Sequence, residues 1–201
     1  MSTVHRFEGH IAGVGTAEGT RLVLGHWPRS PFGPFADAMV ERADGHRVLL
    51  APDERVAEFV SATYRFDEVR LVPVQVRRAG AGWWVSAGPL TLWFEVGSRA
   101  PLGRLLRLVP PAVARSRWWA HAVSPVARVV LPGVRTVGTA GGGRQEWYGA
   151  RDVHRVRTLR ASWAGADLGA LRPVEPPPRF GFSSTPAEPS LVAVTSTVRT
   201  R

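Results

Sequence analysis

The most informative absence in this 201-residue chain is lysine, because all 26 side chains of the lysine-plus-arginine class are arginines. Without an ammonium group there can be no Schiff-base nucleophile and no Gly-Lys-Ser/Thr phosphate loop. Cysteine is absent as well, which excludes a thiolate nucleophile, a disulfide framework, an iron–sulfur cluster and a thiolate-rich zinc site. Asparagine is missing and Ile11 is the single isoleucine, so residues with A/T-rich codons are rare, which indicates a G/C-rich genome.

Long apolar runs are also missing. None approaches the roughly 18 residues that a membrane-spanning helix needs, and residues 1–8 alternate polar and apolar side chains without the apolar core of a signal peptide. We therefore expect a cytoplasmic protein. A hydrophobic content of 44% with eight tryptophans indicates a folded chain, and its length fits a single domain over residues 1–201.

The net charge of +10 is concentrated in the second half of the chain. Residues 1–100 hold 11 arginines and 11 acidic residues, whereas residues 101–201 hold 15 arginines and five acidic residues. No acidic residue lies between Glu95 and Glu146. Genome composition explains arginine in place of lysine, but it does not explain the loss of acids from one segment. The asymmetry is therefore an electrostatic feature, of which a solvated basic face is the commoner cause.

Side-chain alternation and turn residues predict a chain made mostly of strands. The strands are expected over residues 4–15, 20–27, 37–42, 46–51, 69–77, 83–87, 90–96, 144–163 and 191–198. Helices are expected over residues 52–64, 101–108 and 112–123. This order predicts an α+β fold of mostly antiparallel strands, in which a barrel-like or strongly curved sheet carries a few short helices.

The segment 145–154 contains the first group of candidate functional residues. In a regular strand Glu146, Tyr148, Asp152 and His154 point to one face, because side chains alternate with a period of two. Inside a barrel they would form an acid–base set, with His154 titrating near neutral pH beside a carboxylate and a phenol. The alternative is a solvent-facing row with cross-strand ion pairs, and a bulge at Gly149 would divide the four residues between the two faces.

The second candidate feature is the acid-free segment 102–128, which combines arginine and tryptophan on short amphipathic helices. Such a segment suits an anionic bilayer surface, where indole rings lie at the headgroups and cations meet phosphate. It also suits single-stranded nucleic acid, through neutralisation of the backbone and stacking of the bases. The alternative packs its apolar side chains against the sheet and leaves the arginines in water.

A glycine loop at residues 141–143, followed by Arg144, is the third candidate feature. Backbone amides of such a loop can form an anion site, and Arg144 could bind a carboxylate or phosphate through two hydrogen bonds. Most such loops only connect hairpin strands. The six histidines show no metal-ligand spacing such as His-Glu-x-x-His, so we expect no metal and no other cofactor.

Residues 30–41, Ser-Pro-Phe-Gly-Pro-Phe-Ala-Asp-Ala-Met-Val-Glu, resemble the acetoacetate decarboxylase-like superfamily. There a Gly-Pro-aromatic loop leads into a barrel strand beside a hydrophobic cavity, and the similarity covers residues 20–100. The resemblance implies a β-rich barrel with an internal pocket. The decarboxylases of that family use a catalytic lysine, which this chain lacks, so Schiff-base decarboxylation is excluded whatever the fold.

These observations lead to a hypothesis of a small-molecule-binding barrel, or a lysine-independent enzyme, for an apolar ligand with an anionic group. The candidate polar groups are Glu146, Tyr148 and His154. The candidate anion-binding groups are Arg144 or Arg151, and the candidate walls are Trp83, Trp93, Phe94 and Trp147. The alternative is a peripheral module that binds an anionic membrane or single-stranded nucleic acid through residues 102–128. The sequence neither supports nor excludes a structural role, and it leaves the oligomeric state open.

Overall fold

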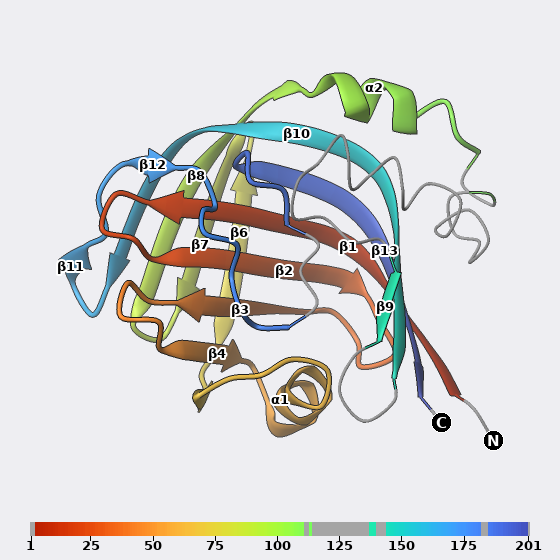
Figure 1. Ribbon diagram of the computed structural model, residues 1–201, viewed down its shortest axis with the longest axis horizontal. Helices are drawn as coiled ribbons and strands as arrows, with labels where there is room; N and C mark the ends of the chain where they lie inside the picture. The colour runs from red at the N-terminus through yellow and green to blue at the C-terminus, as the bar shows by residue number, and fades with distance from the viewer. Residues whose placement is uncertain (1–2, 111–112, 114–136, 140–143, 182–184, 201) are drawn as a thin grey trace.

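The fold was analysed in a computed structural model, which describes residues 3–110, 113, 137–139, 144–181 and 185–200. Within these residues thirteen strands form one strongly curved sheet with two short helices beside it (Figure 1). The predicted α+β class with mostly antiparallel strands is therefore confirmed. Neither of the helices found in these ranges is long and apolar enough to cross a bilayer.

The elements follow the chain in a simple order. The first half contains β1 (Thr3–Thr16), β2 (Arg21–Arg29), β3 (Phe35–Glu41), β4 (Arg47–Ala51), α1 (Glu54–Ser61), β5 (Glu68–Leu71), β6 (Val74–Ala79), β7 (Gly82–Ala87) and β8 (Leu90–Arg99). The second half contains α2 (Pro101–Leu106), β9 (Val137–Thr139), β10 (Gln145–Trp163), β11 (Ala166–Asp167), β12 (Leu171–Arg172) and β13 (Ser190–Thr200).

The order of strands across the sheet is β5-β4-β3-β2-β1-β13-β10-β8-β7-β6. Two further strands, β9 and β11, pair with β10, and β12 pairs with β1. Among the described strands, β4 and β5 are the single parallel pair. A parallel pair requires a crossover connection, and α1 lies in that connection.

The curvature of the sheet brings β6, β7 and β8 behind β1–β4, so that the two parts enclose a core (Figure 1). Val40, Val48 and Leu50 from one part and Trp83 and Phe94 from the other are at most 2% exposed. Burial of this apolar surface is the main favourable contribution to the free energy of folding.

Helix α1 is present where the sequence predicts a helix, but it begins two residues later and ends three residues earlier than predicted. The Asp53 side chain caps it by accepting a hydrogen bond from Val56 N at 2.8 Å, and Glu54 in the first turn suits the helix dipole. Val56 and Ala57 are buried against Leu49 of β4. The helix therefore covers the face of the sheet that points away from the main core.

Most predicted elements are present, and the long strand β10 and the closing strand β13 are confirmed. The single strand predicted over residues 69–77 is wrong, because β5 and β6 are separated at Val72 and Pro73. Proline has no backbone N–H to donate to a strand ladder, and here it marks the break between the two strands. The helix predicted over residues 112–123 lies almost entirely outside the described residues.

Ion pairs to the buried Glu41 of β3 join the segment 173–181 to the sheet. Glu41 of β3 is fully buried and accepts from Arg21 Nη2 at 2.8 Å and from Arg179 Nε at 2.9 Å. Its Oε2 also accepts from the Arg179 backbone N–H at 2.5 Å. Burial alone would raise the pKa of Glu41, but these hydrogen bonds hold it below its usual value.

Replacing Glu41 with glutamine should destabilise the protein, because the Arg21 guanidinium would stay buried without its counter-charge. We expect the free energy of unfolding in urea to fall by about 3 to 5 kcal/mol. Glu8→Gln is the matched control, since Glu8 pairs with the exposed Arg29 at 3.7 Å, and its cost should stay below about 1 kcal/mol. Equal losses of stability in the two variants would show that the buried Glu41 ion pair stabilises the protein no more than the exposed Glu8–Arg29 pair does.

Candidate functional site

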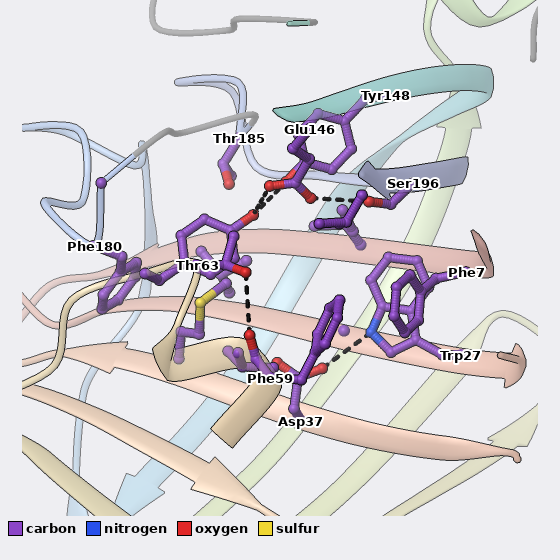
Figure 2. Close-up of a pocket in the computed structure, with 18 of the residues that line it drawn as sticks. Phe7, Trp27, Asp37, Phe59, Thr63, Glu146, Tyr148, Phe180, Thr185 and Ser196 are labelled. Carbon is purple, nitrogen blue, oxygen red and sulfur yellow. Dashed lines mark hydrogen bonds between the residues drawn. The ribbon is translucent and has the colours of Figure 1, made fainter. Parts of the chain in front are cut away.

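A cavity of about 70 Å³ lies between the sheet and α1, on the side away from the main core. Strands β1, β2 and β3 form its floor, and residues from β10 and β13 close one side (Figure 2). Helix α1 and residues 178–181 contribute the rest of its lining, together with Thr185. The cavity therefore combines segments that are far apart in the sequence.

Aromatic side chains make one end of the cavity apolar. The Phe7 ring lies at the centre of this group and packs edge-on against Trp27 at 5.9 Å and against Phe35 at 6.2 Å between ring centroids. Phe59 of α1 lies 5.2 Å from Phe7, so the helix contributes to the same group. Edge-to-face contacts of this kind stabilise the packing beyond the burial of area alone.

Asp37 is a buried acid in this apolar setting. Its Oδ1 accepts from Trp27 Nε1 at 3.0 Å, and the carboxyl forms no further hydrogen bond with the described residues (Figure 2). Burial raises the pKa of Asp37 to about 7, and the Trp27 hydrogen bond opposes this only in part. Asp37 therefore changes its charge near neutral pH while facing the cavity.

Glycine at position 25 is what allows this pair to form. A Cβ at Gly25 would lie 2.4 Å from Asp37 Oδ1 and 2.5 Å from Trp27 Nε1. Even alanine at position 25 would displace the Asp37–Trp27 hydrogen bond. The three residues form one unit, built from the neighbouring strands β2 and β3.

Glu146 forms the second buried acid of the cavity. Tyr64, just beyond α1, donates to its Oε2 at 3.0 Å, and Ser196 of β13 donates to its Oε1 at 2.9 Å (Figure 2). The Tyr148 hydroxyl lies within hydrogen-bond distance of the Tyr64 hydroxyl. Burial raises the pKa of Glu146, although hydrogen bonds from Tyr148, Ser196 and Tyr64 work against the rise. Burial also raises the pKa of Tyr64 well above its usual value, so its phenol stays protonated.

The structure brings Glu146 and Tyr148 together but places His154 elsewhere. The pairing of β10 with β13 shifts register between Ala150 and Asp152, which is a bulge. Beyond it the side chains change faces, and Asp152 and His154 line a different surface hollow beside His10. The arrangement of a regular strand, with all four residues on one face, is therefore not found, because a bulge divides them, as the alternative from the sequence expected. The bulge lies two residues beyond Gly149, the position that the sequence had suggested.

Arg144 lies at the border of the cavity. Its Nη1 donates to Phe59 O at 3.0 Å and lies 3.3 Å from Thr63 Oγ1, and its guanidinium stacks 5.0 Å from the Phe59 ring centroid. These contacts join β10 to the C-terminal end of α1. Arg151 lies at the bulge and is half-buried, and its Nε finds no partner among the described residues.

The four predicted wall residues do not line this cavity. Trp83 and Phe94 stack at 5.7 Å in the main core. Trp93 lies on the outer face of β8, next to Trp84 of β7. Trp147 is buried beside Arg199, on the opposite face of β10 from its neighbours in sequence. Aromatic content alone does not indicate which face of a strand borders a cavity.

Sequence reasoning missed the groups that do line the cavity, and Asp37 above all. A signal was present, because Asp37 and Met39 alternate on one face of the strand predicted over residues 37–42, where an acid is unexpected. Tyr64 was assigned to the end of the predicted helix and given no role. No three histidine, aspartate or glutamate side chains within the described ranges are grouped to hold a metal ion.

The basic segment predicted as a peripheral module is described only at its start. Helix α2 carries Arg104, and Leu105 and Leu108 beside it are 63% and 79% exposed. Residues 111–112 and 114–136, with their arginines and Trp118 and Trp119, lie outside the described residues, as does the glycine loop 141–143.

Comparison with known proteins finds similarity among solved structures only. No family model matches the chain, and no curated protein matches it. The chain is similar to a crystal structure of acetoacetate decarboxylase from Legionella pneumophila, with 8% sequence identity and a TM-score of 0.46. The similarity covers 98% of this chain and 84% of that chain.

Replacing Asp37 with asparagine should change how stability depends on pH. The folded protein binds a proton at Asp37 up to pH of about 7, whereas the unfolded chain releases it near pH 4. Stability of the wild type therefore falls as the pH rises through this window. Relative to Asp37→Asn, the free energy of unfolding should fall by about 2 to 4 kcal/mol between pH 4 and 8. Parallel curves for the two proteins in urea titrations would contradict the raised pKa.

Proposed function

We propose that the protein binds a small, neutral, mostly apolar molecule in the cavity beneath α1, through one hydrogen-bonding group. The observation that carries the proposal is the Asp37 carboxyl, which faces an apolar cavity with a single hydrogen bond from Trp27. A buried acid normally has its hydrogen-bonding capacity satisfied, since an unpaired polar group in an apolar setting is costly. A ligand carbonyl or hydroxyl would supply the missing partner.

The charges around the cavity favour a neutral ligand over the anionic one expected from the sequence. Two acids, Asp37 and Glu146, line the cavity, and no arginine or histidine is among its described lining residues. Arg144 lies at the border, and its Nη1 already donates to Phe59 O. An anionic group would therefore meet two acids without a cation to balance it.

The volume of the cavity limits the size of the ligand. At about 70 Å³ it is roughly half the 150 Å³ of an engineered apolar cavity that binds benzene. The best fit is a molecule of a few heavy atoms, such as a short-chain ketone or alcohol. Met39 and Val60 would contact its apolar part.

Binding can be tested by ligand-detected NMR with short-chain ketones, alcohols and carboxylic acids at pH 6. We expect saturation transfer to neutral ketones or alcohols, and a weaker or absent signal for the carboxylates. Asp37→Ala should weaken the binding by about 5- to 30-fold, because it removes a buried hydrogen-bond donor to the ligand.

The matched control is Glu58→Gln, which removes an exposed carboxyl from the helix that covers the cavity. It should leave the binding unchanged. Thermal unfolding of each variant checks that the fold is intact. Absence of binding by any neutral ligand, or binding that Asp37→Ala does not alter, would overturn the proposal.

A second candidate is proton transfer on the bound ligand, which the pKa of Asp37 near 7 favours, since an acid–base group works best near the ambient pH. It can be tested by the exchange of α-protons of a bound ketone in deuterated water, followed by NMR. We expect exchange that rises as the pH passes 7 and that Asp37→Asn abolishes. Binding without such exchange would leave the protein as a binding domain alone.

A further inference from the structure

The outer face of strands β6, β7, β8 and β10 carries an ordered row of cationic and aromatic side chains. Strand register aligns Arg77 with Trp84, Trp84 with Trp93, and Trp93 with Arg160. The alternate residues of these strands, such as Val85, Leu92 and Ala161, point into the main core. The row therefore faces away from the core, on a part of the molecule remote from the cavity beneath α1.

A second row of polar residues runs beside the first. The same register aligns Gln75 with Ser86, Ser86 with Thr91, and Thr91 with Ser162. The hydroxyls of Thr91 and Ser162 lie 2.6 Å apart. Together the two rows line an open groove of about 1130 Å³. Most sheet faces of this kind carry charged or polar side chains, so two neighbouring indoles are unusual.

The absence of a side chain at Gly82 lets the Trp84 ring lie close to the backbone of the sheet. A Cβ at Gly82 would lie 2.6 Å from Trp84 Cη2, so the ring occupies the space above a residue that has no side chain. Trp84 is 44% exposed, and its ring centroid lies 6.3 Å from that of the half-buried Trp93. The two indoles thus form an apolar platform of two adjacent rings, whose planes are inclined at 52° to each other.

The charges on this face are predominantly positive. Within the described ranges, neither Arg77 nor Arg160 forms a salt bridge, and Arg160 lies 5.7 Å from the Trp93 ring centroid. Two acids lie at the margins. Glu95 is near Arg157 at 3.9 Å, and Asp167 accepts from the backbone N–H of Gly169 at 2.9 Å. Both arginines at the ends of the aromatic row are therefore available to an anion.

We propose that this face binds single-stranded nucleic acid, with bases stacked on Trp84 and Trp93 and phosphates neutralised by Arg77 and Arg160. Bases of any sequence can stack on an indole, and a basic groove follows the phosphate backbone. The hydroxyl row beside the platform offers hydrogen bonds to sugar or phosphate oxygens. This binding site is separate from the small-molecule cavity and does not depend on it.

The geometry favours single strands over duplexes. The Trp84 and Trp93 ring centroids lie 6.3 Å apart and the ring planes are inclined at 52°. Bases in a duplex are parallel and cover each other's faces, so they could not stack on both rings. A single strand leaves its base faces open to the indoles. The arginine at each end of the row favours a polyanion over a neutral glycan.

Fluorescence anisotropy with a labelled oligothymidylate of about twelve nucleotides tests this directly. We expect binding that weakens about sevenfold between about 50 and 200 mM salt, as neutralisation of two phosphates predicts. Trp84→Ala and Trp93→Ala should each weaken it by about 5- to 150-fold. Arg77→Gln should weaken it and lower the salt dependence. A duplex of the same length should bind at least tenfold more weakly.

Arg29→Gln is the matched control, because it also removes an exposed arginine charge, from the end of β2, away from this face. It should change the affinity by less than about twofold, and thermal unfolding checks the fold of each variant. Equal effects of Arg29→Gln and Arg77→Gln, or wild-type affinity in both tryptophan variants, would overturn the proposal. Trp84-dependent binding of a neutral oligosaccharide, or Trp84-dependent dimerisation without oligonucleotide binding, would overturn it as well.

Discussion

The structure depends on the pairing of one long strand, β10. It pairs with β13 along its first half and with β8 along its second, and so joins the two parts of the curved sheet. The bulge between Ala150 and Asp152 reverses which side chains face which way. Before it, Glu146 and Tyr148 point into the cavity, whereas directly after it Asp152 and His154 line a different hollow. Two further register shifts follow, between His154 and Val156 and between Val156 and Thr158, and beyond them Leu159 and Ala161 point into the main core and Arg160 faces outward. These register shifts let a single strand contribute to the core, the cavity and the outer face.

The two buried acids of the cavity are held by different means. Glu146 receives hydrogen bonds from three side chains, those of Tyr148 on β10, Ser196 on β13 and Tyr64 just beyond α1. Asp37 receives one, from Trp27, and its pKa rises to about 7. By contrast, Glu41, four residues further along β3, is ionised between two arginines. Strand β3 therefore holds one acid, Glu41, that is paired with arginines, and another, Asp37, that faces the cavity with one hydrogen bond.

Much of the fold was predictable from sequence, because alternation and turn residues are local properties. Residues 4–15, 37–42 and 191–198 were assigned correctly as strands for this reason. The site was less predictable, because it depends on the position of a bulge and on contacts between segments far apart in the chain. Asp37 and Tyr64 become a site only when β3 and α1 are brought beside β10. Similarly, Trp93 was assigned to a pocket wall, since alternation does not say which face is inside.

The parallel pairing of β4 with β5 has a wider consequence for the architecture. An antiparallel neighbour could have followed β4 after a tight turn. The face of β1–β3 that points away from the main core would then have no helix over it. A parallel neighbour obliges the chain to travel back over the sheet, and α1 is the return path. The position of α1 over the cavity thus follows from the direction of β5 relative to β4. The direction of one strand therefore decides which side chains of the helix, Phe59 and Val60 among them, line the cavity.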